Sequence, residues 1–414
     1  MSLSKELESR GFINQFSAPT LQEIVDGEKR TIYHGIDPTA DSAHVGNLAI
    51  WMLLLHLAKT GHKIIFLVGG GTGLIGDPKP DTERQLKDTK DVSNNVEKIK
   101  KQAEAFFSNS DIEFVNNLEW LSELKIIDFL REVGKHYTVN ELIKKDAIAT
   151  RLQSDTGLSY TEFAYPLLQG FDYLQLFESK NCTVQVGGSD QWGNIISGVE
   201  LIRRKKQAEV FAITVPLIID KTTGKKFGKS EGNAVWLDVE KTSPYTFYQF
   251  WLNVADENVI DYLKIFSLTP LEEISEIERE HELNPGLRIA QKKLAKEVTT
   301  LVHKEHTTTA VENVSNMLFG ERKIDELSEV EKDILIKNAP TVTVSLGKKI
   351  VDILVESRLA TSKREARMFI ESGAVSLHDS RIEEVESVLS ENHFTHHMSI
   401  LKRGKKNICI LVLE

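Results

Sequence analysis

Four short segments of the sequence combine residue types that can hold a nucleotide and a small polar molecule. The first, Asp37–Asn47, reads DPTADSAHVGN and lies between a segment that favours a strand and one that favours a helix. Free N–H groups at the start of a helix attract phosphate, and Gly46 would let a ligand approach the backbone closely. His44 and Thr39 could add side-chain donors. Because Asp, Ser and Thr before a helix are also ordinary caps, this loop indicates phosphate binding only together with a partner motif.

A basic loop, Lys225–Ser230 with the sequence KKFGKS, is that partner. Lys226 and Lys229 stand three positions apart and can contact separate oxygens of one pyrophosphate group. The alternative interpretation is a solvated basic turn. The loop does not fit a P-loop, because that motif requires four residues between its glycines, whereas Gly224 and Gly228 enclose only three.

A glycine cluster, Gly71–Gly76, follows a predicted strand and matches the spacing of a dinucleotide-binding turn. The next residues, Asp77–Pro80, read DPKP and resist the long helix that such a turn requires. We therefore interpret the glycines as space for the base or ribose of a ligand, with Asp77 as an acceptor beneath it.

One helical face carries Tyr165, Gln169 and Asp172, spaced i, i+4 and i+7. A phenol, an amide and a carboxylate together are unusual in a core and suit a ligand with an ammonium and a hydroxyl group.

A second polar group, Gln185, Asp190 and Gln191, follows at the end of a predicted strand and in its loop. Open α/β sheets bind ligands at such strand ends, although each residue alone could be an ordinary surface side chain.

The elements that must position these residues form two β-loop-α-β units, the pattern of a parallel sheet wrapped by helices. The predicted elements are strand 31–35, helix 48–59 and strand 62–68, then strand 182–186, helix 195–205 and strand 210–218. Residues 92–175 are mostly helical in pattern and predict an insertion between the two units.

The remainder of the chain predicts further domains. Residues 244–318 are helical in pattern, interrupted by Pro270 and Pro285, and Pro340 marks a linker into a last unit. The predicted domains are 1–220, a Rossmann-like catalytic domain with a helical insertion; 221–325, the basic loop and an all-α domain; and 341–414, a small α+β domain. The predicted fold class is α/β.

Composition excludes several classes of protein. The 414 residues are 41% hydrophobic and 27% charged, as in soluble globular proteins, and the net charge of -10 argues against nonspecific coating of a polyanion. The apolar run Ala49–Leu57 is too short to span a membrane, and Met1–Phe16 lacks the features of a leader, so we expect a cytoplasmic protein. Cys182 and Cys409 have no partner spacing for zinc or redox chemistry, and no metal ligands are predicted.

Taken together, these motifs make the chain resemble the class I aminoacyl-tRNA synthetases, and specifically the bacterial-type tyrosyl-tRNA synthetases. The resemblance runs in order over nearly the whole chain. It is carried by the loop ending in His44–Asn47 (the HIGH motif of the family), Gly69–Pro78, Tyr165–Asp172, Gly187–Asn194 and Lys226–Ser230 (the KMSKS motif).

The resemblance implies a tyrosine–tRNA ligase, which joins tyrosine to ATP and then to the 3′ end of tRNA(Tyr). It implies that Tyr33 and Asp172 bind the phenol; Tyr165, Gln169 and Asp77 the ammonium group; and Gln185 and Gln191 the tyrosine and adenylate. The implied catalytic residues are Thr39, His44, Lys226 and Lys229, which would meet the ATP phosphates. The implied ATP-binding residues are these two lysines, Asp190 at the ribose, and also Gly35, Asp37, Gly46, Asn47 and Ser230.

The implied chemistry fits this inventory, because the attacking carboxylate of tyrosine is already ionised and needs no general base. Mg²⁺ would accompany ATP as part of the substrate, with no permanently bound cofactor. Groups that read the phenol hydroxyl would reject phenylalanine, for which tyrosyl enzymes are the standard example.

Three positions depart from the family pattern. Asn47 stands where the family often has a second His, and the stretch Lys79–Arg84 is shortened, which leaves Arg84 as a candidate phosphate ligand only. His34 occupies a variable position near the expected ribose site.

The last unit, from Lys348 onward, resembles an RNA-binding module named after a small-subunit ribosomal protein. A solvated charged face is the ordinary reading of its basic residues, but their pattern favours phosphate contact. The expected RNA-binding residues are Lys363, Arg364, Arg367, Lys402, Arg403, Lys405 and Lys406. The resemblance also implies a homodimer, with an interface around residues 128–160.

Two alternatives remain open. A tryptophanyl-tRNA synthetase would share the fold and the ATP motifs, although Tyr33 with Asp172 favours a phenol. An RNA-binding protein that has kept a synthetase fold without activity is less compatible with the intact His44, Lys226 and Lys229.

Overall fold

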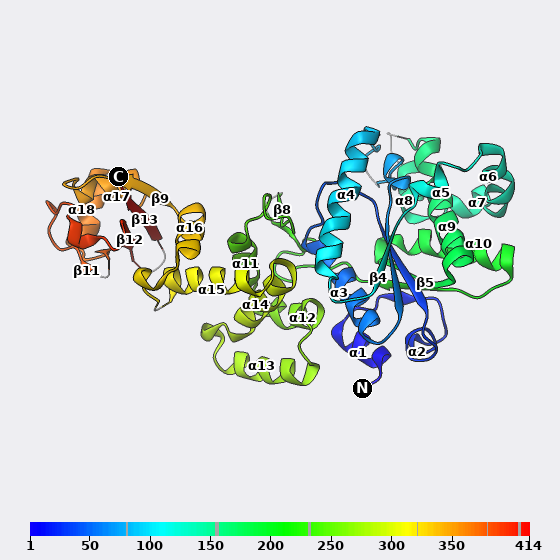
Figure 1. Ribbon diagram of the computed structural model, residues 1–414, viewed down its shortest axis with the longest axis horizontal. Coiled ribbons are helices and arrows are strands. Elements are labelled where there is room, and N and C mark those ends of the chain that lie inside the picture. Colours follow the sequence, from blue (N-terminus) through cyan, green and yellow to red (C-terminus); the bar gives the residue numbers. More distant parts are fainter. Residues whose placement is uncertain (80–81, 154–156, 231–232, 321, 379, 405–406) are drawn as a thin grey trace. The chain divides into compact units, whose positions relative to one another are not determined.

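The computed structural model describes residues 1–414 except 80–81, 154–156, 231–232, 321, 379 and 405–406 (Figure 1). The predicted RNA-binding residues Lys405 and Lys406 lie outside the described residues. The chain divides into two compact units, which are described separately: unit 1 comprises 1–242 and 253–297, and unit 2 comprises 243–252 and 298–414. The division into three domains predicted from the sequence stays a prediction.

Unit 1 is built on a six-stranded sheet with the order β1-β6-β5-β2-β3-β4. The strands are β1 (Gln15–Phe16), β2 (Thr31–Ile36), β3 (Lys63–Val68), β4 (Ile112–Asn116), β5 (Cys182–Gly188) and β6 (Phe211–Val215). All neighbours pair in parallel except β1, which is antiparallel to β6. From β2 the next strands in the sequence, β3 and β4, lie to one side, and from β5 the next strand, β6, lies to the other. Sheets of this kind bind ligands at the carboxyl ends of the two strands where the order reverses, here β2 and β5.

Helices cover both faces of this sheet (Figure 1). On one side lie α3 (Val45–Lys59) and α4 (Thr89–Phe106), and on the other α9 (Tyr160–Lys180) and α10 (Trp192–Lys206). Successive side chains of β2 point to opposite faces of the sheet, because strand side chains alternate with a period of two. Tyr33 belongs to the apolar core shared with α9 and α10, whereas the neighbouring Ile32 is buried outside that cluster.

The shorter helices of unit 1 surround this frame. They are α1 (Leu3–Arg10), α2 (Leu21–Val25), α5 (Leu118–Leu121), α6 (Ile126–Glu132), α7 (Val139–Leu142), α8 (Asp146–Leu152), α12 (Asp256–Phe266) and α13 (Leu271–Leu283), with 3-10 turns at 72–74, 134–136, 189–191 and 285–287. A two-stranded ribbon, β7 (Lys229–Ser230) with β8 (Asn233–Ala234), begins with the last two residues of the basic loop.

A buried ion pair fixes the segment that follows the glycine cluster. Arg151 and Glu162 meet at 3.2 Å with side-chain exposures of 0% and 2%. The Arg151 guanidinium also donates to the carbonyls of Lys79 and Thr82, and Glu162 accepts from the Arg84 amide. Because a buried charge must be paired, this network anchors the backbone of Lys79, Thr82 and Arg84.

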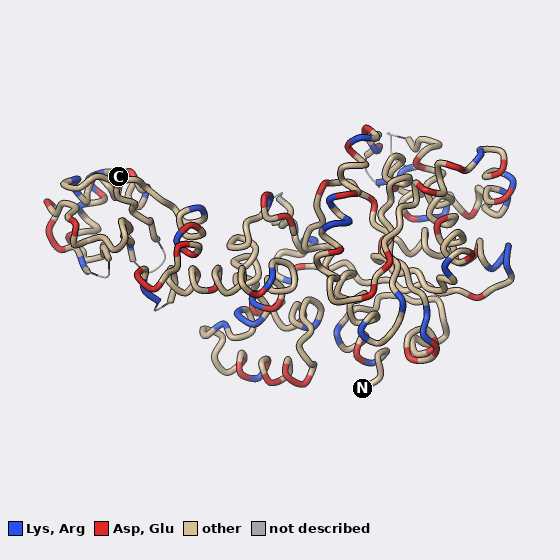
Figure 2. Tube along the Cα trace, in the orientation of Figure 1, with Lys and Arg blue, Asp and Glu red and all other residues tan. Residues whose placement is uncertain are grey.

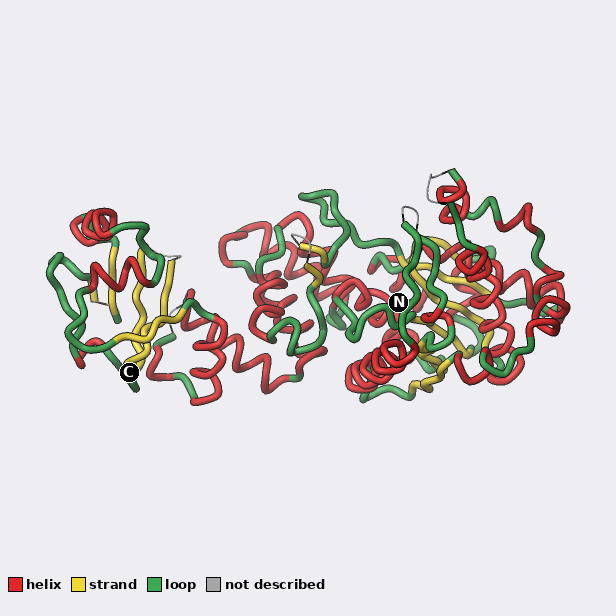
Figure 3. Tube along the Cα trace, turned by 90° about the horizontal axis from the view of Figure 1, so that it is seen from above, coloured by secondary structure: helices red, strands yellow, loops and turns green. Residues whose placement is uncertain are grey.

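Unit 2 contains a five-stranded mixed sheet with the order β11-β10-β12-β13-β9, and Figure 3 shows its strands beside the helices of the unit. The strands are β9 (Thr341–Val344), β10 (Val375–Leu377), β11 (Ser380–Arg381), β12 (Met398–Arg403) and β13 (Asn407–Leu413). The helices are α11 (Pro244–Leu252), α15 (Glu305–Phe319), α16 (Glu329–Asn338), α17 (Ile350–Glu356) and α18 (Lys363–Glu371), with 3-10 turns at 324–326 and 391–393; α14 (Ile289–His303) begins in unit 1 and ends in unit 2.

The predicted fold class is confirmed: a Rossmann-like parallel sheet, a helical region and a C-terminal mixed-sheet domain. Two strands of the main sheet, β1 and β4, were missed. We expected residues 92–175 to be mostly helical, but β4 lies within them as an edge strand of the sheet. Its five residues form one short alternating run without the turn signals of a hairpin, so only pairing with β3 reveals it.

Candidate active site

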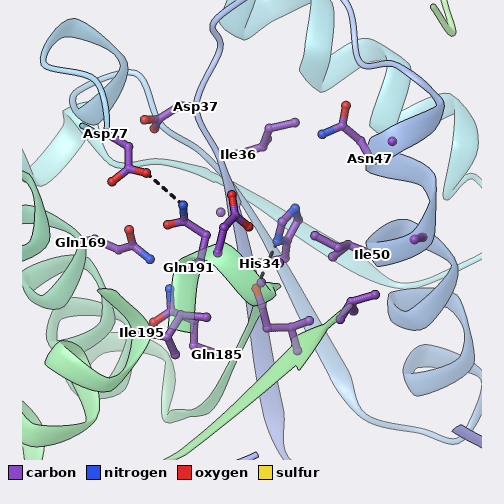
Figure 4. Close-up of a pocket in the computed structure, with 18 of the residues that line it drawn as sticks. His34, Ile36, Asp37, Asn47, Ile50, Asp77, Gln169, Gln185, Gln191 and Ile195 are labelled. Atoms are coloured by element: carbon purple, nitrogen blue, oxygen red, sulfur yellow. Dashed lines mark hydrogen bonds between the residues drawn. The ribbon is translucent and has the colours of Figure 1, made fainter. Parts of the chain in front are cut away.

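A cavity of about 440 Å³ opens at the carboxyl ends of β2 and β5, and all of its lining residues belong to unit 1. Asp77, Gln169 and Gln191 lie along one side of it, and Asn47 and Ile50 of α3 along the other (Figure 4). The predicted site residues that line it are Tyr33, Gly35, Asp37, Thr39, His44, Gly46, Asn47, Asp77, Tyr165, Gln169, Asp172, Gln185, Asp190, Gln191 and Lys226. The side chains of Lys229 and Ser230 lie outside what the structure describes.

The HIGH-like segment closes on itself as a helix cap. His44 is the N-cap of α3, its Nδ1 accepts from the Gly46 amide at 3.0 Å, and its own amide donates to Asn47 Oδ1 at 3.0 Å. A neutral imidazole that accepts through Nδ1 carries its proton on Nε2. His44 can therefore present an Nε2–H donor to the cavity. Asn47, predicted to contact ATP, supplies the second half of this capping box.

Gly46 has a more local reason to be glycine than the ligand approach predicted from the sequence. A Cβ at this position would lie 2.7 Å from His44 Cε1. The absent side chain therefore makes room for the imidazole of the neighbouring cap residue.

The inner end of the cavity combines an unpaired phenol with a paired carboxylate. Asp172 accepts from Asn117 Nδ2 at 2.9 Å and from Trp120 Nε1 at 2.7 Å, and burial raises its pKa to about 7. The Tyr33 hydroxyl is buried and has no hydrogen-bond partner among the described residues. A buried hydroxyl without a partner costs free energy of folding, and a polar ligand group that bonds to it would remove that cost.

A second carboxylate, Asp37, is bonded to a predicted substrate-binding residue. The Tyr165 hydroxyl donates to Asp37 Oδ2 at 2.7 Å, and the Thr72 hydroxyl donates to Asp37 Oδ1 at 2.7 Å. Burial raises the pKa of Asp37 despite these two donors. Asp37 is thus joined directly to the residue expected at the ammonium group.

Asp77 is the third carboxylate of the cavity. It accepts from Gln191 Nε2 at 3.0 Å, the bond drawn in Figure 4, and from Asn194 Nδ2 at 2.9 Å. Burial raises its pKa to about 6, and the negative charge of Asp37 adds to the shift. Asp172 is buried and Asp37 and Asp77 are half-buried, and the negative charge of Asp37 raises the pKa of the other two. Carboxylates that disfavour each other's charge make this side of the cavity suited to a cation.

His34 is held in the opposite tautomer to His44. Its Nδ1 lies 3.1 Å from the Val186 carbonyl, which can only accept, so Nδ1 carries the proton and Nε2 is an acceptor. Burial lowers the pKa of His34 to about 4, so the ring is neutral at physiological pH.

The loop that carries Lys226 is anchored on both sides. The Phe227 ring packs against Tyr262 and Phe266 of α12, with centroid distances of 4.6 and 5.3 Å. Gly228 has φ +81°, and a Cβ there would lie 2.5 Å from Val45 Cγ2 at the start of α3. The two phosphate-type motifs of the sequence are therefore in direct contact.

Sequence reasoning missed several residues that position these groups: Thr72, Asn117, Trp120 and Asn194. Asn117 directly follows β4, at the same carboxyl edge of the sheet as the cavity. Recognising β4 from the sequence would have drawn attention to Asn117, because strand ends in such sheets collect site residues.

Comparison with known proteins places the chain in a family. Residues 26–320 match the family of class I tRNA synthetases (W and Y), and residues 329–411 match the tyrosine–tRNA ligase SYY-like C-terminal domain. Tyrosine–tRNA ligase 2 of Enterococcus faecalis is 45% identical over 98% of both chains, and tyrosine–tRNA ligase of Bacteroides thetaiotaomicron is 44% identical over 100% of both. The chain belongs to the class I tyrosyl-tRNA synthetase family.

Solved structures agree with this assignment of the fold. A C-terminally truncated mitochondrial tyrosyl-tRNA synthetase of Aspergillus nidulans is similar with a TM-score of 0.70 and 29% identity, over 77% of this chain and 94% of that one. A tryptophanyl-tRNA synthetase of Plasmodium falciparum has a TM-score of 0.55 at 14% identity, over 80% of this chain and 87% of that one. Since the fold is shared with tryptophanyl enzymes, the residues in the cavity must distinguish the two.

Asp172 gives the stability of the ligand-free protein a testable pH dependence. Its pKa is 3.8 in the unfolded chain and about 7 in the folded one, so between these values unfolding releases a proton and becomes easier as pH rises. Its contribution is fully present below about pH 4 and is lost as pH rises to about 7. We predict that the free energy of unfolding, measured by urea titration, falls over this window by about 2–4 kcal/mol more in wild type than in Asp172→Asn.

A matched control is Asp220→Asn. The pKa of Asp220 is lowered by hydrogen bonds, chiefly from Thr222, so this carboxylate contributes stability above its unfolded pKa, a contribution that is lost as pH falls. Equal pH slopes for wild type and Asp172→Asn would contradict the prediction.

Proposed function

We propose that the chain is a tyrosine–tRNA ligase, which forms tyrosyl-adenylate from tyrosine and ATP and then transfers tyrosine to the 3′ end of tRNA(Tyr). The observation that carries the proposal is the buried Tyr33 hydroxyl, which has no hydrogen-bond partner in the described part of the chain and lines the same cavity as Asp172. In a fold shared with tryptophanyl enzymes, this pair is suited to a phenol hydroxyl.

The phenol of the substrate would donate to Asp172 and accept from Tyr33. Each carboxylate oxygen has a second lone pair, so Asp172 can keep its bonds to Asn117 and Trp120 while it accepts a third. Phenylalanine would leave the buried Tyr33 hydroxyl without a partner among the described residues and would give Asp172 no third donor, which is the basis of strong discrimination.

The ammonium group would lie near Asp77, Tyr165 and Gln169, where it would relieve the repulsion between the carboxylates of Asp37 and Asp77. Asp37, first assigned to ATP, would act here through its bond to Tyr165. Gln185 and Gln191 would orient the tyrosine and the adenylate; the buried Oε1 of Gln185 has no hydrogen-bond partner among the residues that the structure describes.

ATP would occupy the outer part of the cavity. Its phosphates would meet the Nε2–H of His44, Thr39 and Lys226, joined by Lys229 and Ser230 of the same loop. Asp190 and the acceptor Nε2 of His34 suit the ribose hydroxyls, with the backbone of Gly35 and Gly46 nearby and Asn47 as the cap that holds His44. Mg²⁺ would arrive with ATP, since no group of three or more metal-type ligands occurs among the described residues.

The reaction then needs positioning and charge stabilisation rather than a base. A carboxylate oxygen of tyrosine attacks the α-phosphorus, the bond to the bridging oxygen breaks, and pyrophosphate leaves with both bonding electrons. Donors such as His44 Nε2–H and Lys226 would stabilise the charge that develops on the leaving group.

The direct test is ATP–pyrophosphate exchange driven by each amino acid in turn. We predict exchange with tyrosine and none above background with tryptophan or phenylalanine. Asp172→Ala should abolish exchange while the circular dichroism spectrum is kept, because the phenol loses its acceptor. Exchange driven by tryptophan, or normal tyrosine exchange in Asp172→Ala, would refute the proposed pocket.

We further propose that the C-terminal residues of unit 2 bind the tRNA. Arg364 and Arg367 are exposed on α18, and Lys363 pairs with Asp352 at 2.6 Å. The Arg403 guanidinium of β12 lies 4.8 Å from the centre of the Phe369 ring of α18, which brings the two predicted basic clusters together. Acidic residues alternate with them along the chain (Figure 2), so contact would be local rather than a broad basic surface.

We predict that replacing Lys363, Arg364 and Arg367 together by Gln lowers tRNA affinity while tyrosine-dependent exchange stays normal. Loss of three phosphate contacts should reduce the slope of log affinity against log salt by about 2 to 3. Filter binding at several salt concentrations measures both. Gln at three exposed lysines, Lys292, Lys323 and Lys337, changes the net charge equally and should not alter the slope. Equal effects of the two triples would contradict the assignment.

A homodimer is proposed from the helical insertion. Large apolar side chains are exposed there among polar ones, namely Ile126, Ile127, Leu130, Val139, Ile143, Leu152 and Tyr160. Such exposed apolar residues favour a protein partner, and a second copy of the chain agrees with the family resemblance.

No helix among the described residues is long and apolar enough to cross a membrane. The proposed substrates, ATP and tRNA, fit a cytoplasmic enzyme.

We predict that Ile126→Glu combined with Ile127→Glu shifts the mass measured by light scattering from dimer to monomer, because two charges would have to be buried. The two side chains are 72% and 63% exposed. Leu283→Glu, at a residue 78% exposed outside the insertion, should leave the mass unchanged. A wild-type monomer, or a dimer that persists in the double variant, would remove this interface.

A further inference from the structure

Residues that follow the basic loop pair with the segment that carries His44. The Val45 amide donates to the Val235 carbonyl at 2.9 Å, and the Leu237 amide donates to the Ala43 carbonyl at 3.0 Å. His44 and Trp236 form an isolated antiparallel bridge between these two bonds. The chain thus returns from the loop of Lys226 to lie beside the cap residue of α3.

The Trp236 side chain contacts the imidazole of His44. The two ring centroids are 6.0 Å apart at an interplanar angle of 69°, an edge-to-face arrangement. Together with the bond from the Gly46 amide to Nδ1, this contact leaves the imidazole little rotational freedom. Its Nε2–H is the group that the proposed reaction uses.

The Trp236 ring is in turn contacted by Lys241, which forms an ion pair with Asp41. Lys241 Nζ lies 5.1 Å from the centre of the Trp236 ring and 2.5 Å from Asp41 Oδ1. Lys98 of α4 pairs with the other oxygen of Asp41 at 2.8 Å. The two lysines, Lys241 first, keep the pKa of Asp41 at about 2, so this anchor is charged at any physiological pH.

We propose that Trp236 is a positioning residue for His44, which holds the imidazole with its Nε2–H directed at the phosphates of ATP and links it to the loop of Lys226. The proposal rests on adenylate formation as the proposed function. Its physical basis is that a donor stabilises developing charge only when its direction is fixed beforehand.

The kinetic test is a double-mutant cycle in tyrosine-dependent ATP–pyrophosphate exchange on the full chain. We expect Trp236→Leu to lower kcat about tenfold without changing the KM for tyrosine, and Trp236→Phe, which keeps an aromatic edge, to retain most of the activity. In a His44→Ala background, Trp236→Leu should cause no further loss, because its target is gone. If the kcat losses of the two single variants multiply in the double variant, the proposal is overturned. A rise in the KM for tyrosine as large as the loss in kcat in Trp236→Leu would also overturn it.

Two lysines provide a matched control, since both bind Asp41 but only Lys241 reaches Trp236. Lys241→Met should lower kcat severalfold and Lys98→Met should leave it unchanged. Equal effects would show that the ion pair with Asp41, and not the tryptophan, matters. Thermal unfolding of every variant identifies losses caused by misfolding.

A readout that does not need activity separates this inference from the proposed function. In ¹⁵N-histidine NMR spectra of the ligand-free chain, the signals lost in His44→Ala should show the Nε2–H tautomer. They should shift or broaden in Trp236→Leu and stay in place in Lys98→Met. Unchanged His44 signals in Trp236→Leu overturn the positioning role, whereas failure of the wild type to exchange with tyrosine overturns the proposed function alone.

Discussion

Burial of negative charge around one cavity is the constraint on which the site depends. Asp172 is buried there, Asp37 and Asp77 are half-buried, and removal from water raises the pKa of each. Neutral donors, among them Asn117 and Thr72, stabilise them without cancelling their charge. A ligand with a cationic group and a hydroxyl would complete what the folded chain leaves unsatisfied, and its binding would offset the cost of removing these carboxylates from water.

The sheet makes this arrangement possible. Its strand order reverses between β2 and β5, so the ends of these strands diverge and leave room for a ligand. The helices that cover the two faces then contribute different chemistry. α9 presents Tyr165, Gln169 and Asp172 from one side, and α3 presents its N-terminus with His44 from the other. The proposed amino-acid pocket and the proposed phosphate site therefore belong to one cavity, as an acyl-adenylate reaction would require.

Direct contacts join the two phosphate-type motifs, which lie far apart in the sequence. Gly228 packs against Val45, and Trp236 packs against His44. Packing alone requires a small residue at such points, even without a ligand, as Gly46 illustrates. Glycines in a binding motif can therefore serve the shape of the motif itself rather than contact with the substrate.

The sequence by itself determined the parallel α/β frame, the family and which residue types gather in the cavity, because helical and strand periodicities and motif spacing are local properties. It could not reveal β4, whose short run becomes a strand only by pairing with β3. Nor could it show that Tyr165 bonds to Asp37, that Asn117 and Trp120 hold Asp172, or that Asn47 caps α3. Partners and tautomers are decided by tertiary structure, since a buried polar group bonds to whatever the fold brings within about 3 Å, however distant in the chain.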